Sequence, residues 1–213
     1  TFKELSDEES GDPLIGQATY PVCATCHGSQ GEGVVALNSP KLSGQEGWYL
    51  ETQLRNFKNG VRGAHEDDEF GRQMAPMAAL LADEAAIRNM AAYITTFPEH
   101  TGDTSLSGDA VRGQHLYRTC GTCHGVNGEG NYATNSPRLR GQEDWYMKRQ
   151  LQNFISGVRG VHREDLFGPQ MRSMSRMLRT EKDINDVVAY INTLEPAVDQ
   201  NQIADAAMQG GGD

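Results

Sequence analysis

The chain has 213 residues, 37% of them hydrophobic, and a formal net charge of −10. With this acidic balance we expect no nucleic-acid partner, and no run of apolar residues is long enough to cross a bilayer. We therefore expect a mature, soluble form whose export signal or membrane anchor lies upstream or was removed.

The first predicted element, after an acidic start at residues 1–12, is a helix that runs into a cysteine motif. Gly16 and Tyr20 are four residues apart and share one face of this helix. The motif Cys23-Ala24-Thr25-Cys26-His27 has the spacing of covalent haem attachment. Two thiols add across the vinyl groups of a c-type haem, and the adjacent histidine then binds the iron from one side. Disulfides, a thioredoxin-like redox pair or a four-cysteine zinc site would explain the cysteines but not the histidine.

Two further helices are predicted in the first half of the chain. One begins near Glu46, whose carboxylate suits a helix N-terminus, and ends at Gly60. The other is capped by Asp83 and carries an apolar stripe along one face. The stripe consists of Ile87, Ala91 and Ile94. No alternating strand pattern competes with these helices, so the predicted fold class is all-α.

The whole pattern recurs 97 residues later, after a short polar segment at 101–108 that is typical of a linker. Pairing residues 13–98 with 110–195 gives 43 identities in 86 pairs without a gap, including a second motif, Cys120-Gly121-Thr122-Cys123-His124. We therefore predict an N-terminal domain at 1–100, the linker, and a C-terminal domain at 109–213 with a polar tail. A buried haem would supply the apolar mass that so small a domain lacks.

These features together resemble the dihaem class-I c-type cytochromes of the cytochrome c4 family. The resemblance is carried by the two CxxCH motifs, the segments at 38–42 and 135–139, the Gly-Gln-Glu-x-Trp-Tyr helix starts and the Gln-Met-x-x-Met stretches, and it covers residues 13–195. It implies two covalently bound haem c groups in tandem domains that face each other about a pseudo-twofold axis, with the haem propionate edges close together. It also implies a periplasmic electron carrier, soluble or membrane-associated, which agrees with haem attachment outside a reducing cytosol.

The ligand on the second side of each iron decides between an electron carrier and a catalyst, because an iron with an open side can bind oxygen, peroxide or nitrogen oxides. Two methionine pairs obey the repeat: Met74 with Met171, and Met77 with Met174. A thioether favours ferrous iron and raises the potential. The family pattern implies that the first methionine of each Met-x-x-Met is the ligand, with Met77 and Met174 as alternative ligands or as core packing.

A repeated histidine offers another ligand. His65 and His162 lie ahead of the methionines in equivalent positions, and bis-histidine ligation would lower the potentials. Their neighbours are polar and charged, which favours a hydrated loop, and a hydrogen bond to a propionate or a carboxylate is a further role. His100 and His115 do not repeat and are expected on the surface.

The resemblance also implies which residues surround the ligands. In class-I cytochromes the ligating histidine donates its other ring N–H to a proline carbonyl, which implies Pro40 and Pro137 here. The alternative is that these prolines only shape their loops. Three repeated pairs carry donors that can reach haem propionates, although packing explains the aromatic ones equally well. They are Trp48 with Trp145, Tyr49 with Tyr146, and Arg62 with Arg159.

Three functions from different classes fit these sites. The first is a freely docking carrier that takes electrons from a quinol-oxidising complex and passes them to a terminal oxidase or reductase. The second is the dihaem subunit of a dehydrogenase whose catalytic partner is a separate chain. The third, a dihaem peroxidase-type enzyme, needs two inequivalent sites, whereas both halves here offer a methionine. We therefore expect redox protein partners, no catalytic residues and no small-molecule substrate.

The two halves differ in charge. Residues 13–98 hold 6 Lys and Arg against 9 Asp and Glu, whereas residues 109–195 hold 12 against 10. Net positive surroundings disfavour the ferric state, which carries one more positive charge than the ferrous state. The haem at His124 is therefore predicted to have the higher potential, so that electrons enter at the His27 haem, although solvent screening reduces this effect.

Overall fold

The computed structural model describes residues 10–102 and 104–195. This part of the chain is helical, with two isolated β-bridges, Val34–Ser39 and Asn131–Ser136, and no strand. The N-terminal domain contains α1 (Pro13–Thr19), α2 (Pro21–His27), the short 3-10 helix η1 (Val35–Leu37), α3 (Gly47–Lys58), α4 (Glu69–Ala79) and α5 (Glu84–Ile94). The C-terminal domain contains α6 (Ala110–His124), η2 (Tyr132–Thr134), α7 (Asp144–Ser156), α8 (Gly168–Ser175) and α9 (Glu181–Ile191). The predicted all-α class and the duplication are confirmed.

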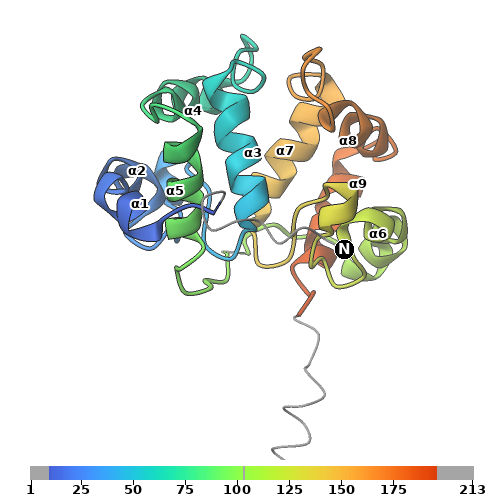
Figure 1. Cartoon of the computed structure of the whole chain (residues 1–213). Coiled ribbons are helices and arrows are strands. Elements are labelled where there is room, and N and C mark those ends of the chain that lie inside the picture. Colours follow the sequence, from blue (N-terminus) through green and yellow to red (C-terminus); the bar gives the residue numbers. More distant parts are fainter. Residues whose placement is uncertain (1–9, 103, 196–213) are drawn as a thin grey trace, which may run out of the picture.

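The two domains lie side by side, with α3 and α7 facing each other at the centre and α1, α2 and α6 on the outer sides (Figure 1). Several contacts between the domains are reciprocal: Gln142 donates to the Lys41 carbonyl, and the equivalent Gln45 donates to the Arg138 carbonyl. This is the pseudo-twofold arrangement that the resemblance implied. None of the described helices is long and apolar enough to cross a membrane.

In each domain the first and last helices cross at close range, α1 on α5 and α6 on α9. A Cβ atom added at Gly16 or Gly113 would collide with the backbone carbonyl of the helix that it crosses, so only glycine allows this approach. Tyr20, one turn after Gly16, is 3% exposed and packs in the core with residues of α3 and α5. The shared face of the first predicted helix is therefore the face that meets the last helix.

The structure differs from the sequence-based helices in two ways. The first helix of the N-terminal domain is divided into α1 and α2, whereas α6 is continuous. The division falls at Pro21, which has no N–H to donate to the preceding turn, and the equivalent residue Arg118 has one. The second difference is a pair of helices that the sequence did not predict, α4 and α8, which carry the two methionine pairs.

Two glutamates at the starts of the central helices join the domains. The predicted helix starts are confirmed, because Glu46 and Glu143 directly precede α3 and α7, but neither carboxylate makes a capping hydrogen bond to its own helix. Glu143 instead accepts a hydrogen bond from the backbone N–H of Lys41 at 2.8 Å, and Glu46 accepts one from the N–H of Arg138 at 3.1 Å. Burial raises the pKa of Glu46, and the N–H of Arg138 from the opposite domain opposes this effect only in part.

The segment between the domains docks on the C-terminal domain. The Gly102 amide donates to the Gly141 carbonyl at 2.9 Å, and the amides of Ser105 and Leu106 both donate to the Asp144 carboxylate. Leu106 also packs against the core of that domain. The predicted linker is therefore anchored to one side of the interface rather than running free between the two domains.

An ion-pair cluster is present where α6 crosses α9, and the described residues form no such cluster at the equivalent crossing of α1 and α5. Asp186 accepts from Arg112 at 2.5 Å, from Lys182 at 2.6 Å and from the Asp109 amide at 2.8 Å. Burial raises the pKa of Asp186, but these donors outweigh burial and lower it to about 2. The equivalent residue, Asn89, accepts the matching amide without a charge, at 2.7 Å.

We predict that Asp186→Asn weakens the acid dependence of stability. A carboxyl group with a depressed pKa stabilises the folded state above its unfolded value of 3.8, and this stabilisation is lost as the pH falls towards about 2. The variant should therefore melt at a lower temperature than the wild type at pH 7, and the two melting temperatures should converge near pH 2. Circular dichroism melts across this range test the prediction. A constant difference at all pH values would contradict it.

Candidate haem sites

Each CxxCH motif lies at the end of a helix, in α2 and in α6. Both helices stop at a glycine with a positive φ, 84° at Gly28 and 83° at Gly125, so the chain turns away immediately after the histidine. His27 is 7% exposed and His124 is 6% exposed. The geometry thus buries one imidazole in each domain directly beside two cysteine thiols.

A single hydrogen bond orients each buried imidazole. His27 Nδ1 lies 2.7 Å from the carbonyl oxygen of Pro40, and His124 Nδ1 lies 2.7 Å from that of Pro137. Because a carbonyl oxygen can only accept, Nδ1 carries the proton and Nε2 keeps its lone pair for a metal. Burial lowers the pKa of both histidines, although the proline carbonyls oppose it, and this favours the neutral form that binds iron.

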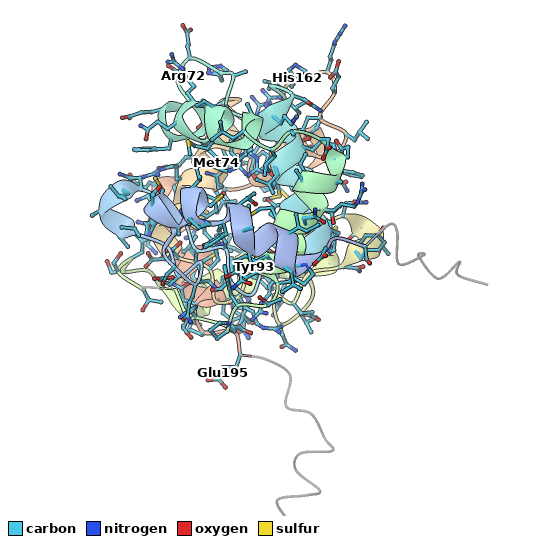
Figure 2. All side chains as sticks on the ribbon, turned by 60° about the vertical axis from the view of Figure 1, so that its left-hand side comes forward. Arg72, Met74, Tyr93, His162 and Glu195 are labelled. Atoms are coloured by element: carbon cyan, nitrogen blue, oxygen red, sulfur yellow. The ribbon has the colours of Figure 1, made fainter. Side chains whose placement is uncertain are left out.

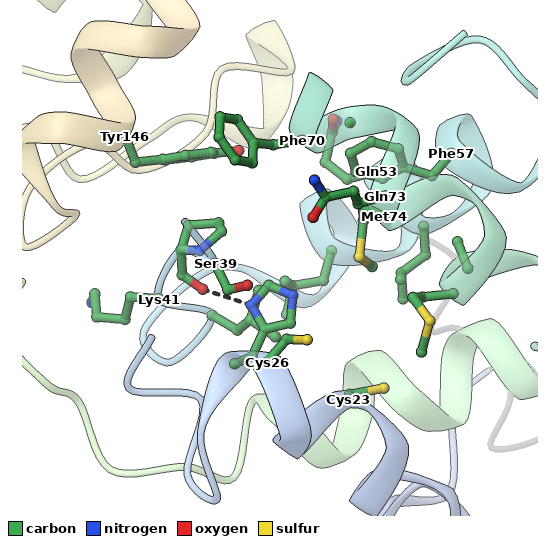
Figure 3. Close-up of a pocket in the computed structure, with 18 of the residues that line it drawn as sticks. Cys23, Cys26, Ser39, Lys41, Gln53, Phe57, Phe70, Gln73, Met74 and Tyr146 are labelled. Atoms are coloured by element: carbon green, nitrogen blue, oxygen red, sulfur yellow. Dashed lines mark hydrogen bonds between the residues drawn. The ribbon is translucent and has the colours of Figure 1, made fainter. Parts of the chain in front are cut away.

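A cavity of about 260 Å³ in the N-terminal domain is lined by Cys23, Cys26 and His27 on one side. Met74, which is half-buried in α4, points into the cavity from the opposite side (Figure 3). Met77 also lines it. The rest of the wall is mostly apolar, with residues of α3, α4 and α5. The cavity therefore combines two attachment points, one histidine and a thioether around an apolar space, which fits a haem.

Two largely buried guanidinium groups meet between this cavity and the other domain. Arg62 donates to Gln53, Gln150 and Tyr146, and Arg159 donates in the same way to Gln150, Gln53 and Tyr49, over 2.8–3.1 Å. Within the described residues, neither arginine forms an ion pair, and the buried Arg62 Nε has no hydrogen-bond partner. Uncompensated cations favour a bound anion, and the propionates of a haem are anionic.

The arginine network also affects the tyrosines that contact it. Burial by itself would raise the pKa of the Tyr49 phenol, but the guanidinium groups of Arg159 and Arg62 outweigh burial and lower that pKa. Burial would likewise lower the pKa of Arg159, but Tyr49 and Tyr146 raise it. The positive charge is therefore stabilised at the interface rather than lost by deprotonation.

The predicted propionate donors divide into two groups. Arg62, Tyr49 and Tyr146 line the cavity, so the second domain contributes to the first domain's site. Trp48 is not among the lining residues and instead packs edge-on against Tyr132 of the opposite domain, with ring centroids 5.6 Å apart. Packing between domains, which the sequence left open for these aromatic residues, therefore accounts for Trp48.

The repeated histidines occupy exposed turns. His65 Nδ1 accepts the Asp67 amide at 3.1 Å, and His162 Nδ1 accepts the Glu164 amide at 3.2 Å. His65 is not among the residues that line the N-terminal cavity, and Figure 2 shows His162 at the upper end of the molecule. This geometry favours the loop role over axial ligation.

The sequence carries no signal for Arg149, which enters the site from the other domain. Arg149 of α7 lines the N-terminal cavity, donates to Asn38 Oδ1 at 2.5 Å and lies over the Phe70 ring at 4.1 Å. Its equivalent in the first half is Thr52, so the repeat gave no signal for it. Gln53 and Gln150, by contrast, do repeat, and only their structural role was missed.

Comparison with known proteins agrees with this geometry. A family model described as Cytochrome c matches residues 14–98 and again 110–195. Cytochrome c4 of Azotobacter vinelandii is 35% identical over 199 residues, covering 87% of this chain and 90% of that protein. The thiosulfate dehydrogenase electron acceptor of Stutzerimonas stutzeri is 30% identical over 164 residues, covering 72% of each.

Among solved structures, the crystal structure of reduced recombinant cytochrome c4 from Pseudomonas stutzeri is 30% identical, with a TM-score of 0.69. The match covers 87% of this chain and 100% of that chain. A haem bound in each site supplies one-electron exchange at its iron. The chain belongs to the cytochrome c4 family, as a dihaem electron-transfer cytochrome with two covalently bound haem c groups.

Proposed function

We propose that this protein is a periplasmic carrier that takes single electrons from a quinol-oxidising complex and passes them to a terminal oxidase or reductase. The observation that carries the proposal is the equivalence of the two sites, each with a buried histidine held by a proline carbonyl and a repeated methionine on a neighbouring helix. A site closed on both sides of the iron exchanges electrons but leaves no position for a substrate. We therefore expect no catalytic turnover by the isolated chain.

His27 and His124 are the proposed ligands on one side of each iron, with Cys23, Cys26, Cys120 and Cys123 as the thioether positions. Met74 and Met171 are the proposed ligands on the other side. The apolar wall excludes water, and Arg62, Arg159 and the two tyrosines of the interface are the proposed donors to the propionates. Because these donors reach across the interface, the two sites share one set of residues.

A second candidate function is the electron-accepting subunit of a separate dehydrogenase. It is favoured by the similarity to the thiosulfate dehydrogenase electron acceptor of Stutzerimonas stutzeri. Purification from native membranes distinguishes the two, because a free carrier elutes as a small protein whereas a subunit co-elutes with a large catalytic chain. Turnover of thiosulfate, peroxide or nitrite by the purified chain alone would contradict both functions.

The charge difference between the domains is concentrated beside the proposed methionine ligands. Residues 64–82, which include α4, hold one Arg against four Asp and Glu, whereas residues 161–179, which include α8, hold four Arg against two. Outside these segments the paired residues 13–98 hold five Lys and Arg against five Asp and Glu, and residues 110–195 hold eight against seven. In Figure 1, α4 and α8 lie on opposite outer sides of the molecule. This polarity supports two docking surfaces of opposite charge, one for the electron donor and one for the acceptor.

We predict that Met74→Ala and Met171→Ala each change one haem only. Loss of the thioether should abolish half of the near-infrared methionine-to-iron charge-transfer band of the oxidised protein and lower the corresponding potential. Met77→Ala and Met174→Ala are the matched controls, because each removes a methionine three residues away. If the control variants lose the band instead, Met77 and Met174 are the ligands.

We predict that the His124 haem has the higher potential, so that electrons enter at the N-terminal domain and leave from the C-terminal one. Redox titration of the wild type beside the two methionine variants assigns each wave. Arg163→Glu, which introduces the residue found at position 66 of the first half, should lower the His124 wave at low ionic strength and less at high ionic strength. The proposed direction is wrong if the higher wave belongs to the His27 haem.

A further inference from the structure

One peptide group contacts the His27 site on one side and the opposite domain on the other. The Pro40 carbonyl accepts from His27 Nδ1 at 2.7 Å, and the Lys41 N–H donates to Glu143 at 2.8 Å. These two groups belong to the same peptide unit, because the carbonyl of one residue and the amide of the next share one plane. A carboxylate of the C-terminal domain is thus connected to the buried imidazole of the N-terminal domain by two hydrogen bonds.

The same arrangement recurs in the opposite direction. The Pro137 carbonyl accepts from His124 Nδ1 at 2.7 Å, and the Arg138 N–H lies 3.1 Å from both carboxylate oxygens of Glu46. Each domain therefore supplies the carboxylate for the other domain's histidine. The two connections cross the interface as a pair related by the pseudo-twofold axis.

The chain is adapted to hold these carboxylates in place. Glu143 is only 2% exposed, and a Cβ atom added at Gly33 or Gly130 would collide with the Glu143 or Glu46 carboxylate. The amide of Gly33 in turn donates to the His27 carbonyl at 2.8 Å. Neither glutamate makes a side-chain hydrogen bond to the start of its own helix, and each accepts a backbone N–H of the opposite domain.

An ionised acceptor changes the peptide that it contacts. A negative charge at the N–H polarises the peptide unit and makes its carbonyl oxygen a stronger acceptor, as in other chains of hydrogen bonds at low local dielectric. The histidine then donates its Nδ1–H more strongly, and its Nε2 becomes a more basic ligand. A more basic ligand stabilises oxidised iron relative to reduced iron, which lowers the reduction potential.

We propose that Glu143 tunes the His27 haem and that Glu46 tunes the His124 haem, each through one peptide group of the opposite domain. The two glutamates are positioning residues, since they act on the iron through the histidine. The proposal rests on the histidine ligation given under the proposed function. It adds that the reduction potential of each haem depends on a residue of the neighbouring domain.

The test uses the intact dihaem protein and the isosteric variants Glu143→Gln and Glu46→Gln. An amide oxygen can still accept the peptide N–H, so the charge is removed with little change of shape. We expect Glu143→Gln to raise the reduction potential of the His27 haem and to leave that of the His124 haem unchanged. Glu46→Gln should raise the reduction potential of the His124 haem only. The NMR signal of the ligand His Nδ1–H in the reduced protein should move to lower chemical shift at the same haem.

Gln142→Ala is the matched control, because Gln142 also reaches Lys41 across the interface but donates to its carbonyl, at 3.2 Å, and carries no charge. This control should move neither wave by a comparable amount. Equal shifts of both reduction potentials would overturn the proposal, because a loosened interface would cause them. A shift in the potential of the haem in the mutated domain would also overturn it, because the direct field of the carboxylate would cause that shift. A high-spin wild type would contradict the ligation itself, whereas a low-spin protein without the crossed shifts contradicts only this inference.

Discussion

The peptide units Pro40–Lys41 and Pro137–Arg138 set the geometry of the two sites. Each must present its carbonyl to a buried imidazole and its N–H to a carboxylate of the other domain. The loop meets this constraint with Asn38 in the left-handed region at φ 54°, which reverses the chain just before Pro40. The equivalent Asn135 has φ 51°, so the same turn is used twice. A displacement of this loop would change the histidine and the interface together.

The buried arginines Arg62 and Arg159 place two positive charges at the interface that can attract an anionic group. Burying a cation is costly unless partners satisfy it, and the partners here are neutral amides and phenols rather than carboxylates. Replacing these partners by carboxylates would neutralise the cations and remove the attraction for an anionic group. The two glutamates lie at the interface as well, where each accepts a hydrogen bond from a backbone amide of the opposite domain. Neutral side-chain partners leave the charge of the two cations available to an anionic group.

Much of the fold could be predicted because the informative residues act locally. The CxxCH motifs, the cap at Asp83 and the apolar stripe of α5 all report on contacts within a few residues. The helices α4 and α8 were missed because proline interrupts or begins them and α8 is short, so their periodic signal is weak. The contact of Glu46 with the opposite domain was missed for a different reason. An acidic residue before a helix has a local explanation, and only the position of the second domain reveals the distant one.

The two halves have diverged at the surface and at the rim of one site, while the buried connections remain paired. Arg149 covers Phe70, whereas Thr52 leaves the equivalent Phe167 42% exposed. Surface charge can change without disturbing packing, so a duplicated protein can acquire two docking faces while the histidine environments stay alike. A difference in potential between the haems must then come from unpaired residues such as Arg149 and the arginines of 161–179. The two equivalent glutamates shift both reduction potentials in the same direction. They therefore affect the mean of the two potentials and not the difference between them.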